Sequence, residues 1–146
     1  MSRFFEFANN HPILLGLLIA LIILFFMLES RRQGAKISPS ELGILTNTKG
    51  AKVIDLREPK EFNAGHIAGS QNIPYSRLGE NIESLKATGA PLIFVCKMGT
   101  VAGSAIVKLD HQDTYRLAGG IMNWQSSGLP LVTPMSSKAK PSKAKS

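Results

Sequence analysis

An uninterrupted apolar segment near the amino end is the strongest constraint on how this chain can fold. Residues 12–28 read PILLGLLIALIILFFML and contain no charged side chain. As a helix, this segment would span about 25 Å, close to the ~30 Å hydrocarbon core of a bilayer. Apolar residues occupy every side of that helix, whereas a helix at the edge of a globular core keeps a polar face. The sequence therefore predicts a transmembrane helix over residues 12–28.

A cleaved secretory signal is the main alternative for this segment. Residues 27–32, MLESRR, offer no small residues at a cleavage position, and the apolar run is longer than that of a usual signal peptide. Arg3 is the single basic residue before the segment, whereas Arg31, Arg32 and Lys36 follow it closely. The positive-inside rule then predicts a single-pass anchor with its N-terminus outside the cell and the rest of the chain in the cytoplasm.

The net charge of +7 suggests a nucleic-acid-binding protein until the charge is divided along the chain. Residues 1–36 carry +2, residues 37–133 carry +1 and residues 134–146 carry +4. The tail, residues 135–146, reads MSSKAKPSKAKS and has no aromatic side chain among its lysines. Such a tail cannot offset the entropy of ordering, so we expect it to be disordered, with weak attraction to anionic lipid as the alternative role. We expect no nucleic-acid partner.

Histidine and cysteine usage limits the chemistry that this chain can perform. The single cysteine, Cys96, excludes a disulfide within the chain and a cysteine-rich zinc site. His11, His66 and His111 are too scattered in the sequence to indicate a metal cluster. We therefore expect no metal ion and no cofactor.

Composition divides the chain into five segments, of which one is long enough to form a domain. A short segment over residues 1–11 precedes the helix at 12–28, and a basic juxtamembrane linker over 29–36 follows it. The domain covers residues 37–134, and the lysine-rich tail covers 135–146.

Within the domain, short apolar segments alternate with helical patterns. We expect strands over residues 51–56, 71–73, 91–96 and 114–117, and helices over 38–47, 59–64, 76–89, 100–109 and 120–128. Ser38 and Glu41 form the pattern of a capping box, and Ser76 is expected to cap a later helix. This alternation predicts an α/β domain with a small, mainly parallel sheet flanked by helices.

Cys96 follows the most apolar of the expected strands, at the end of a parallel strand where ligands bind in α/β sheets. If the loop after it curls around the sulfur, its backbone N–H groups form an anion-binding nest at the start of a helix. Such a nest favours the nucleophilic thiolate, and it would also hold an anionic substrate. A buried structural cysteine is an equally good explanation of the loop alone. The candidate substrate-binding residues are Lys97, Met98, Gly99, Thr100 and Val101.

Motifs before the cysteine distinguish between these two explanations. Residues 55–62, DLREPKEF, and 65–74, GHIAGSQNIP, resemble the paired D-x-R…E-F and G-H-I-x-G-A-x-N-I-P motifs of the rhodanese (sulfurtransferase) family. The resemblance continues through the Cys96 loop and through Gly119-Gly120-Ile121-x-x-Trp124, and it covers residues 36–134. An anchor followed by one such domain resembles small rhodaneses of the bacterial inner membrane.

This resemblance implies a rhodanese-like α/β fold and a persulfide intermediate on Cys96. A small anionic sulfur donor such as thiosulfate would be attacked by the thiolate, and a thiol or a protein would then accept the sulfur. Backbone N–H groups from Lys97 to Val101 would stabilise the persulfide. Asp55 and Arg57 are expected to support the site as an ion pair or loop brace, and His66 as a turn-fixing hydrogen-bond partner.

The Cys96 loop departs from the family at its end. Val101 and Ala102 stand where many family loops carry arginine, serine or threonine, and Glu61 stands where some tandem-domain members hold a basic residue. A phosphatase would need arginine at Ala102 to clamp a phosphoryl group. The remaining alternative is a catalytically weak or inactive rhodanese-like interaction module at the membrane.

Overall fold

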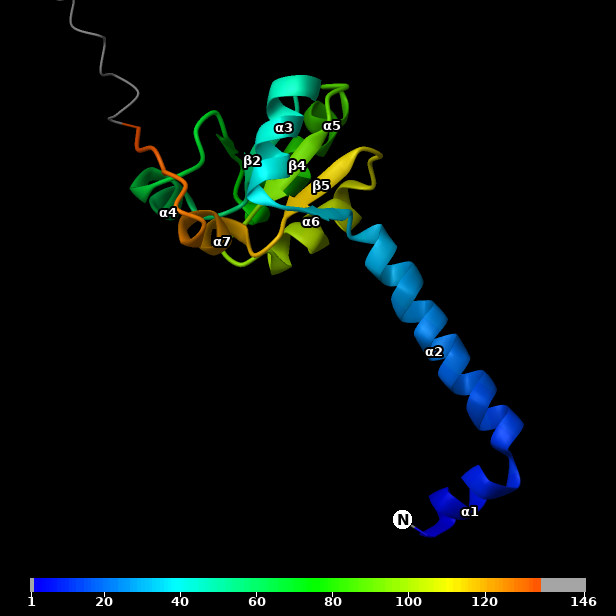
Figure 1. The fold of residues 1–146 in the computed structure, drawn as a ribbon. Coiled ribbons are helices and arrows are strands. Elements are labelled where there is room, and N and C mark those ends of the chain that lie inside the picture. Colours follow the sequence, from blue (N-terminus) through cyan, green and yellow to red (C-terminus); the bar gives the residue numbers. More distant parts are fainter. Residues whose placement is uncertain (1, 135–146) are drawn as a thin grey trace, which may run out of the picture. The chain divides into compact units, whose positions relative to one another are not determined.

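The computed structural model describes residues 2–134, so the tail over residues 135–146, which we expect to be disordered, lies outside the described residues. The chain divides into two compact units, and the boundary falls between Arg32 and Gln33. The first unit holds α1 (Ser2–Asn10) and α2 (Pro12–Arg32) (Figure 1). Helix α2 has 21 residues and no buried residue, and it is the one helix in the described part of the chain that is long and apolar enough to cross a membrane. At about 1.5 Å per residue, it reaches the thickness of a hydrocarbon core.

The second unit is a five-stranded parallel sheet in the order β1-β5-β4-β2-β3, with helices on both faces (Figure 1). This architecture confirms the predicted α/β fold. The strands are β1 (Ala35–Ile37), β2 (Lys52–Asp55), β3 (Gln71–Asn72), β4 (Leu92–Val95) and β5 (Thr114–Leu117). The helices are α3 (Pro39–Lys49), α4 (Pro59–Ala64), the 3-10 turn η1 (Tyr75–Arg77), α5 (Leu78–Lys86), α6 (Thr100–Leu109) and α7 (Gly120–Ser126).

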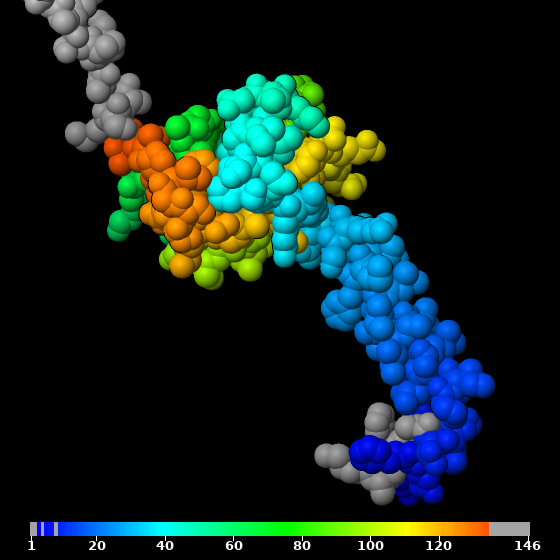
Figure 2. Space-filling view, in the orientation of Figure 1, coloured from blue at the N-terminus to red at the C-terminus, as the bar shows by residue number. Residues whose placement is uncertain are grey.

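Alternation along the central strands divides the core into two layers. Ile54 and Phe94 point toward α5 and α6, where they join one buried cluster. Val53 and Val95 point to the other face, where they pack with residues of α3 and α7. Figure 2 shows α3 (cyan) and α7 (orange) side by side over that second face. Because β4 is buried on both faces, it reads as a continuous apolar run in the sequence.

Helix α3 begins with the predicted capping box. The backbone N–H of Glu41 donates to Ser38 Oγ at 3.2 Å, and the backbone N–H of Ser38 donates to Glu41 Oε2 at 2.7 Å. These bonds to Ser38 favour the carboxylate and hold the pKa of Glu41 below its ordinary value of 4.5. The capping box thus places the first buried residue of α3, Leu42, against the sheet.

The predicted cap at Ser76 is wrong. Ser76 lies inside η1, whose N-cap residue is Pro74. The backbone N–H of Arg77 donates to the Pro74 carbonyl at 2.8 Å. Helix α5 therefore starts two residues later, at Leu78, without a side-chain cap.

Strand β1 was not predicted, because it has only three residues and the middle one, Lys36, is polar. That residue falls in the segment read as a linker, and its pairing with β5 is visible only in the tertiary structure.

Candidate active site

Cys96 directly follows β4, the middle strand of the sheet, and precedes the loop that leads to α6. All four residues of β4 are buried, so the strand holds the backbone of Cys96 in a fixed position. The cysteine is 4% exposed and forms no disulfide. The thiol therefore lies at the carboxyl edge of a parallel sheet, where α/β folds bind their ligands.

The loop curls back on the sulfur through one backbone group. The N–H of Gly99 donates to Cys96 Sγ at a donor–acceptor distance of 3.0 Å. Gly99 has φ 92°, in the left-handed region that favours glycine, and it is the N-cap residue of α6. The same backbone conformation therefore turns an N–H toward the sulfur and starts the helix behind it. The Gly99 N–H is therefore placed to donate to negative charge that develops on the sulfur.

The start of α7 holds the other side of the loop. The N–H of Ile121 donates to the Cys96 carbonyl at 2.9 Å, and the N–H of Met122 donates to the Lys97 carbonyl at 3.2 Å. This close approach depends on Gly120, which has φ 59°. A Cβ at position 120 would collide with the Cys96 carbonyl oxygen and lie 2.7 Å from the Lys97 carbonyl oxygen. The Gly119-Gly120 motif therefore acts by letting α7 dock against the cysteine loop.

Cys96 lines a cavity of about 270 Å³, which we call the thiol cavity. Lys97 and Val101 line it from the loop, and both are exposed. Glu58 and Glu61, from the segment after β2, add two exposed carboxylates to its wall. Leu56, Arg57, Tyr75 and Cys96 complete the lining. Since one water occupies about 30 Å³ in the liquid, the thiol cavity has room for a small donor molecule.

The Arg57 side chain is paired with the Asp55 carboxylate. Its Nε and Nη2 donate to Asp55 Oδ1 and Oδ2 at 3.0 and 2.7 Å, and Nη2 also donates to the Gly65 carbonyl at 2.7 Å. The Asp55 side chain is 1% exposed and that of Arg57 is 9% exposed. Asn72 Nδ2 donates to the backbone carbonyls of both residues. The pair thus braces the segment that forms one wall of the thiol cavity.

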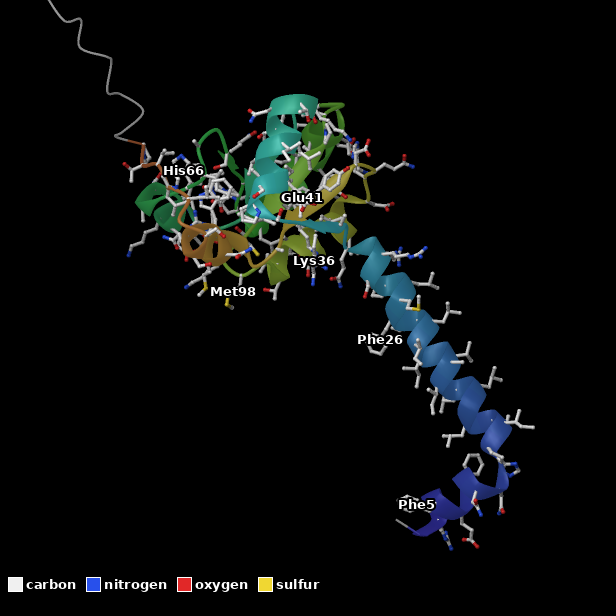
Figure 3. All side chains as sticks on the ribbon, viewed as in Figure 1. Phe5, Phe26, Lys36, Glu41, His66 and Met98 are labelled. Atoms are coloured by element: carbon white, nitrogen blue, oxygen red, sulfur yellow. The ribbon has the colours of Figure 1, made fainter. Side chains whose placement is uncertain are left out.

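His66 lies beside α4, away from the lining of the thiol cavity (Figure 3). Its Nδ1 donates to the Phe62 carbonyl at 2.9 Å, and its ring stacks on that of Phe62 with centroids 3.8 Å apart. Its backbone pairs with Val132 in both directions, at 2.9 and 2.8 Å. The structure does not bring His66 to the sulfur, and these contacts fasten the end of the domain to α4.

The five predicted loop residues separate between two cavities. Lys97 and Val101 line the thiol cavity, whereas Met98, Gly99 and Thr100 line a second cavity of about 180 Å³. Sequence reasoning also missed Leu56, Glu58 and Tyr75, which line the thiol cavity. Glu58 directly follows the braced Arg57, and Tyr75 directly follows the N-I-P motif, so their positions beside known motifs were the available signals.

Residues 38–127 match the rhodanese-like domain family. This chain belongs to that family. As a rhodanese-like protein it is 34% identical over 94 residues to the thiosulfate sulfurtransferase GlpE of Pseudomonas aeruginosa PAO1, covering 62% of this chain and 84% of that relative. It is also 32% identical over 142 residues to the uncharacterized protein YibN of Escherichia coli K12, covering 90% of this chain and 98% of YibN.

Solved structures agree with this assignment to the rhodanese-like family. The crystal structure of a rhodanese-related protein from Thermoplasma volcanium aligns with a TM-score of 0.59 at 32% identity, covering 67% of this chain and 97% of that one. The human single-domain sulfurtransferase TSTD1 aligns with a TM-score of 0.53 at 27% identity, covering 64% of this chain and 96% of that one. The rhodanese-like domain therefore accounts for the second unit of the chain.

Proposed function

We propose that this chain is a membrane-anchored sulfurtransferase that carries sulfane sulfur as a persulfide on Cys96. The observation that carries the proposal is the Gly99 N–H aimed at the sulfur of Cys96, a residue that lines an open cavity. Membership of the rhodanese-like family and the likeness to a thiosulfate sulfurtransferase support the same reaction type.

The proposed reaction has two half-reactions on one sulfur. The Cys96 thiolate attacks the outer sulfur of a donor such as thiosulfate, and a new S–S bond forms. The donor's own S–S bond breaks, and sulfite leaves with the electron pair. An acceptor thiolate, or cyanide in an assay, then attacks the outer sulfur of the persulfide and regenerates the thiolate. Because the enzyme alternates between two covalent states, we expect ping-pong kinetics.

The residues around the sulfur would have separate roles in this reaction. The Gly99 N–H would stabilise negative charge on the cysteine before and after each transfer. Lys97 would attract an anionic donor, since Arg57 is already paired with Asp55. Glu58 and Glu61 would oppose that attraction, which favours donors with less negative charge than thiosulfate.

The decisive experiment measures the mass of the intact protein. The full chain in neutral detergent is incubated with thiosulfate, polysulfide or mercaptopyruvate, and then weighed by mass spectrometry. We expect the addition of one sulfur atom, its loss on treatment with cyanide, and no addition to the Cys96→Ser variant. Failure of all three donors to add sulfur at Cys96 would refute the sulfurtransferase proposal.

We also propose that α2 anchors the protein in a bacterial inner membrane with the rhodanese-like domain in the cytoplasm. The length of α2 supports the anchor. The basic residues Arg31 and Arg32 at its end support the orientation. Reporter fusions at Ser146 provide the test. Reporters that work only in the cytoplasm should be active, and activity restricted to reporters of the translocated side would reverse the orientation.

The second candidate function is an interaction module. Met98 and Val101 are 59% and 39% exposed, so the loop presents apolar surface that a protein partner could cover. A Cys96→Ser chain that fully replaces the natural one in the cell would favour this function over sulfur transfer.

A further inference from the structure

The second cavity, which we call the rear cavity, shares no lining residue with the thiol cavity. Its volume is about 180 Å³, and Met98, Gly99 and Thr100 form the wall on the loop side. Lys36 of β1 and Arg116 of β5 also form its wall, together with Leu117, Ala118 and Gly119. Figure 3 labels Lys36 and Met98, which approach the rear cavity from the strand and from the loop.

Two cations lie next to each other in this wall. Lys36 and Arg116 are register partners in the parallel pair of β1 and β5, so their side chains leave the sheet on the same face. Their neighbours Ile37 and Leu117 pack into the opposite layer of the core, so the two cations point toward the side that α6 covers. Like charges on neighbouring strands repel each other, which destabilises the pair unless an anion lies between or beside them.

Arg116 is less exposed than Lys36, and its guanidinium has a donor without a hydrogen-bond partner. Its Nε is buried and has no hydrogen-bond partner. The side chain extends along α6, because a Cβ at Gly103 would lie 2.7 Å from Arg116 Nη1. Within residues 2–134, the structure pairs neither Arg116 nor Lys36 with a carboxylate. A buried donor without an acceptor is costly. Arg116 lines the rear cavity, so an anion there would lie beside this unpaired cation.

Helix α6 contributes to the same positive environment. Gly99 is its N-cap residue and Thr100 is its first residue, and both line the rear cavity. The helix has 10 residues, and its N-cap makes no side-chain hydrogen bond. The Gly99 N–H already donates to Cys96 Sγ, so the dipole of α6 and its remaining first-turn N–H groups favour a negative charge there. No carboxylate is among the residues that line the cavity.

We propose that the rear cavity is a binding site for a small tetrahedral oxyanion, with Arg116 and Lys36 as its charged ligands. A doubly charged oxyanion offers acceptors to both side chains and to the start of α6 at once. Inorganic sulfate, inorganic phosphate and the phosphomonoester head group of phosphatidic acid share this chemistry. Cys96 does not line the cavity, so replacing Cys96 removes the proposed nucleophile without removing a residue of the oxyanion site.

The test uses the full chain, labelled with nitrogen-15, in neutral detergent. Sodium sulfate is titrated against sodium chloride at constant ionic strength, while the Nε–H signal of Arg116 and the amide signals of Gly99 and Thr100 are followed by NMR. We expect these signals to move with one saturable curve, and phosphate to act in the same way. The Cys96→Ser variant should bind equally well, which separates this proposal from the sulfurtransferase one.

Charge variants distinguish a specific site from general attraction to a basic protein. Lys36→Gln should weaken sulfate binding about tenfold, which is the loss expected for one charge-assisted hydrogen bond. Because the Lys36 side chain is exposed, we expect this variant to fold normally. Arg116→Gln combined with Lys36→Gln should abolish binding. Lys49→Gln removes an exposed charge outside both cavities and should leave binding unchanged.

Three results would overturn the oxyanion site. They are the absence of a saturable shift with either inorganic anion, an equal effect of Lys49→Gln and Lys36→Gln, and retained binding in the double variant. In nanodiscs, a shift that needs phosphatidic acid and is not produced by free phosphate would identify the lipid head group as the source of the oxyanion. Equal shifts in phosphatidylcholine discs with free phosphate would identify the soluble ion.

Discussion

Gly120→Ala tests the inference that α7 holds the cysteine loop in place. The residue has φ 59°, and a side chain in the left-handed region costs about 1–2 kcal/mol. The new methyl group would also collide with the carbonyl oxygen of Cys96, so the start of α7 must move away. That movement breaks the bonds from Ile121 and Met122, each worth about 0.5–1.5 kcal/mol. We expect a total loss of about 2–5 kcal/mol.

Gly50→Ala is the matched control for this substitution. Gly50 has φ 62°, but a Cβ there would meet nothing within 4 Å. It therefore shares the backbone cost of about 1–2 kcal/mol and lacks the collision. The two variants should differ by about 1–3 kcal/mol, which is the contribution of the contact between α7 and the loop.

The free energy of unfolding can be followed through Trp124, the single tryptophan of the chain, which lies on α7 and packs against the core. Urea unfolding in neutral detergent provides the difference in the free energy of unfolding. The rate of persulfide formation with excess donor measures the reactivity of the Cys96 sulfur. Gly120→Ala should slow that rate, whereas Gly50→Ala should leave it unchanged. Equal stabilities of the two variants, or an unchanged rate in Gly120→Ala, would refute the proposed docking of α7.

Three further predictions concern the charged residues. Converting Glu58 and Glu61 to glutamine should accelerate persulfide formation from thiosulfate about two- to fivefold at low ionic strength, with no change for an uncharged donor; a salt-independent gain would argue against electrostatics. Arg57→Ala should cost about 3–5 kcal/mol in urea unfolding because it leaves Asp55 buried and unpaired, and adding Asp55→Asn should restore part of that loss. If the double variant loses as much stability as the two single variants added together, the pairing of Arg57 with Asp55 is contradicted. The lowered pKa of Glu41 means that its contribution to stability is present above pH 4.5 and is lost as the pH falls through the folded-state pKa; the stability advantage over Glu41→Gln should shrink accordingly, and an advantage that grows in acid would contradict the sign.

Local patterns in the sequence predicted most of the elements and pointed to Cys96 as the candidate nucleophile. The apolar run at residues 12–28, the capping box at Ser38 and the buried run at β4 depend on neighbours in the chain, so their structures follow from spacing alone. The motifs around Asp55 and in the Cys96 loop indicated the family, because each is a short run of neighbouring residues. Ser76 failed as a cap because Pro74 imposes a 3-10 turn first, which is a competition between two local signals.

The tertiary structure alone decided how the cysteine loop is supported and what surrounds it. Strand β1 brings Lys36 beside Arg116 across 80 positions of sequence, and no periodic pattern marks a three-residue edge strand. The approach of Gly120 to the Cys96 carbonyl and the carboxylates in the thiol cavity likewise depend on strand order and helix docking. The sequence thus indicated Cys96 as the proposed nucleophile, because a strand–loop–helix unit is local. Packing between distant segments determined the two cavities, because register and close approach arise only when the sheet assembles.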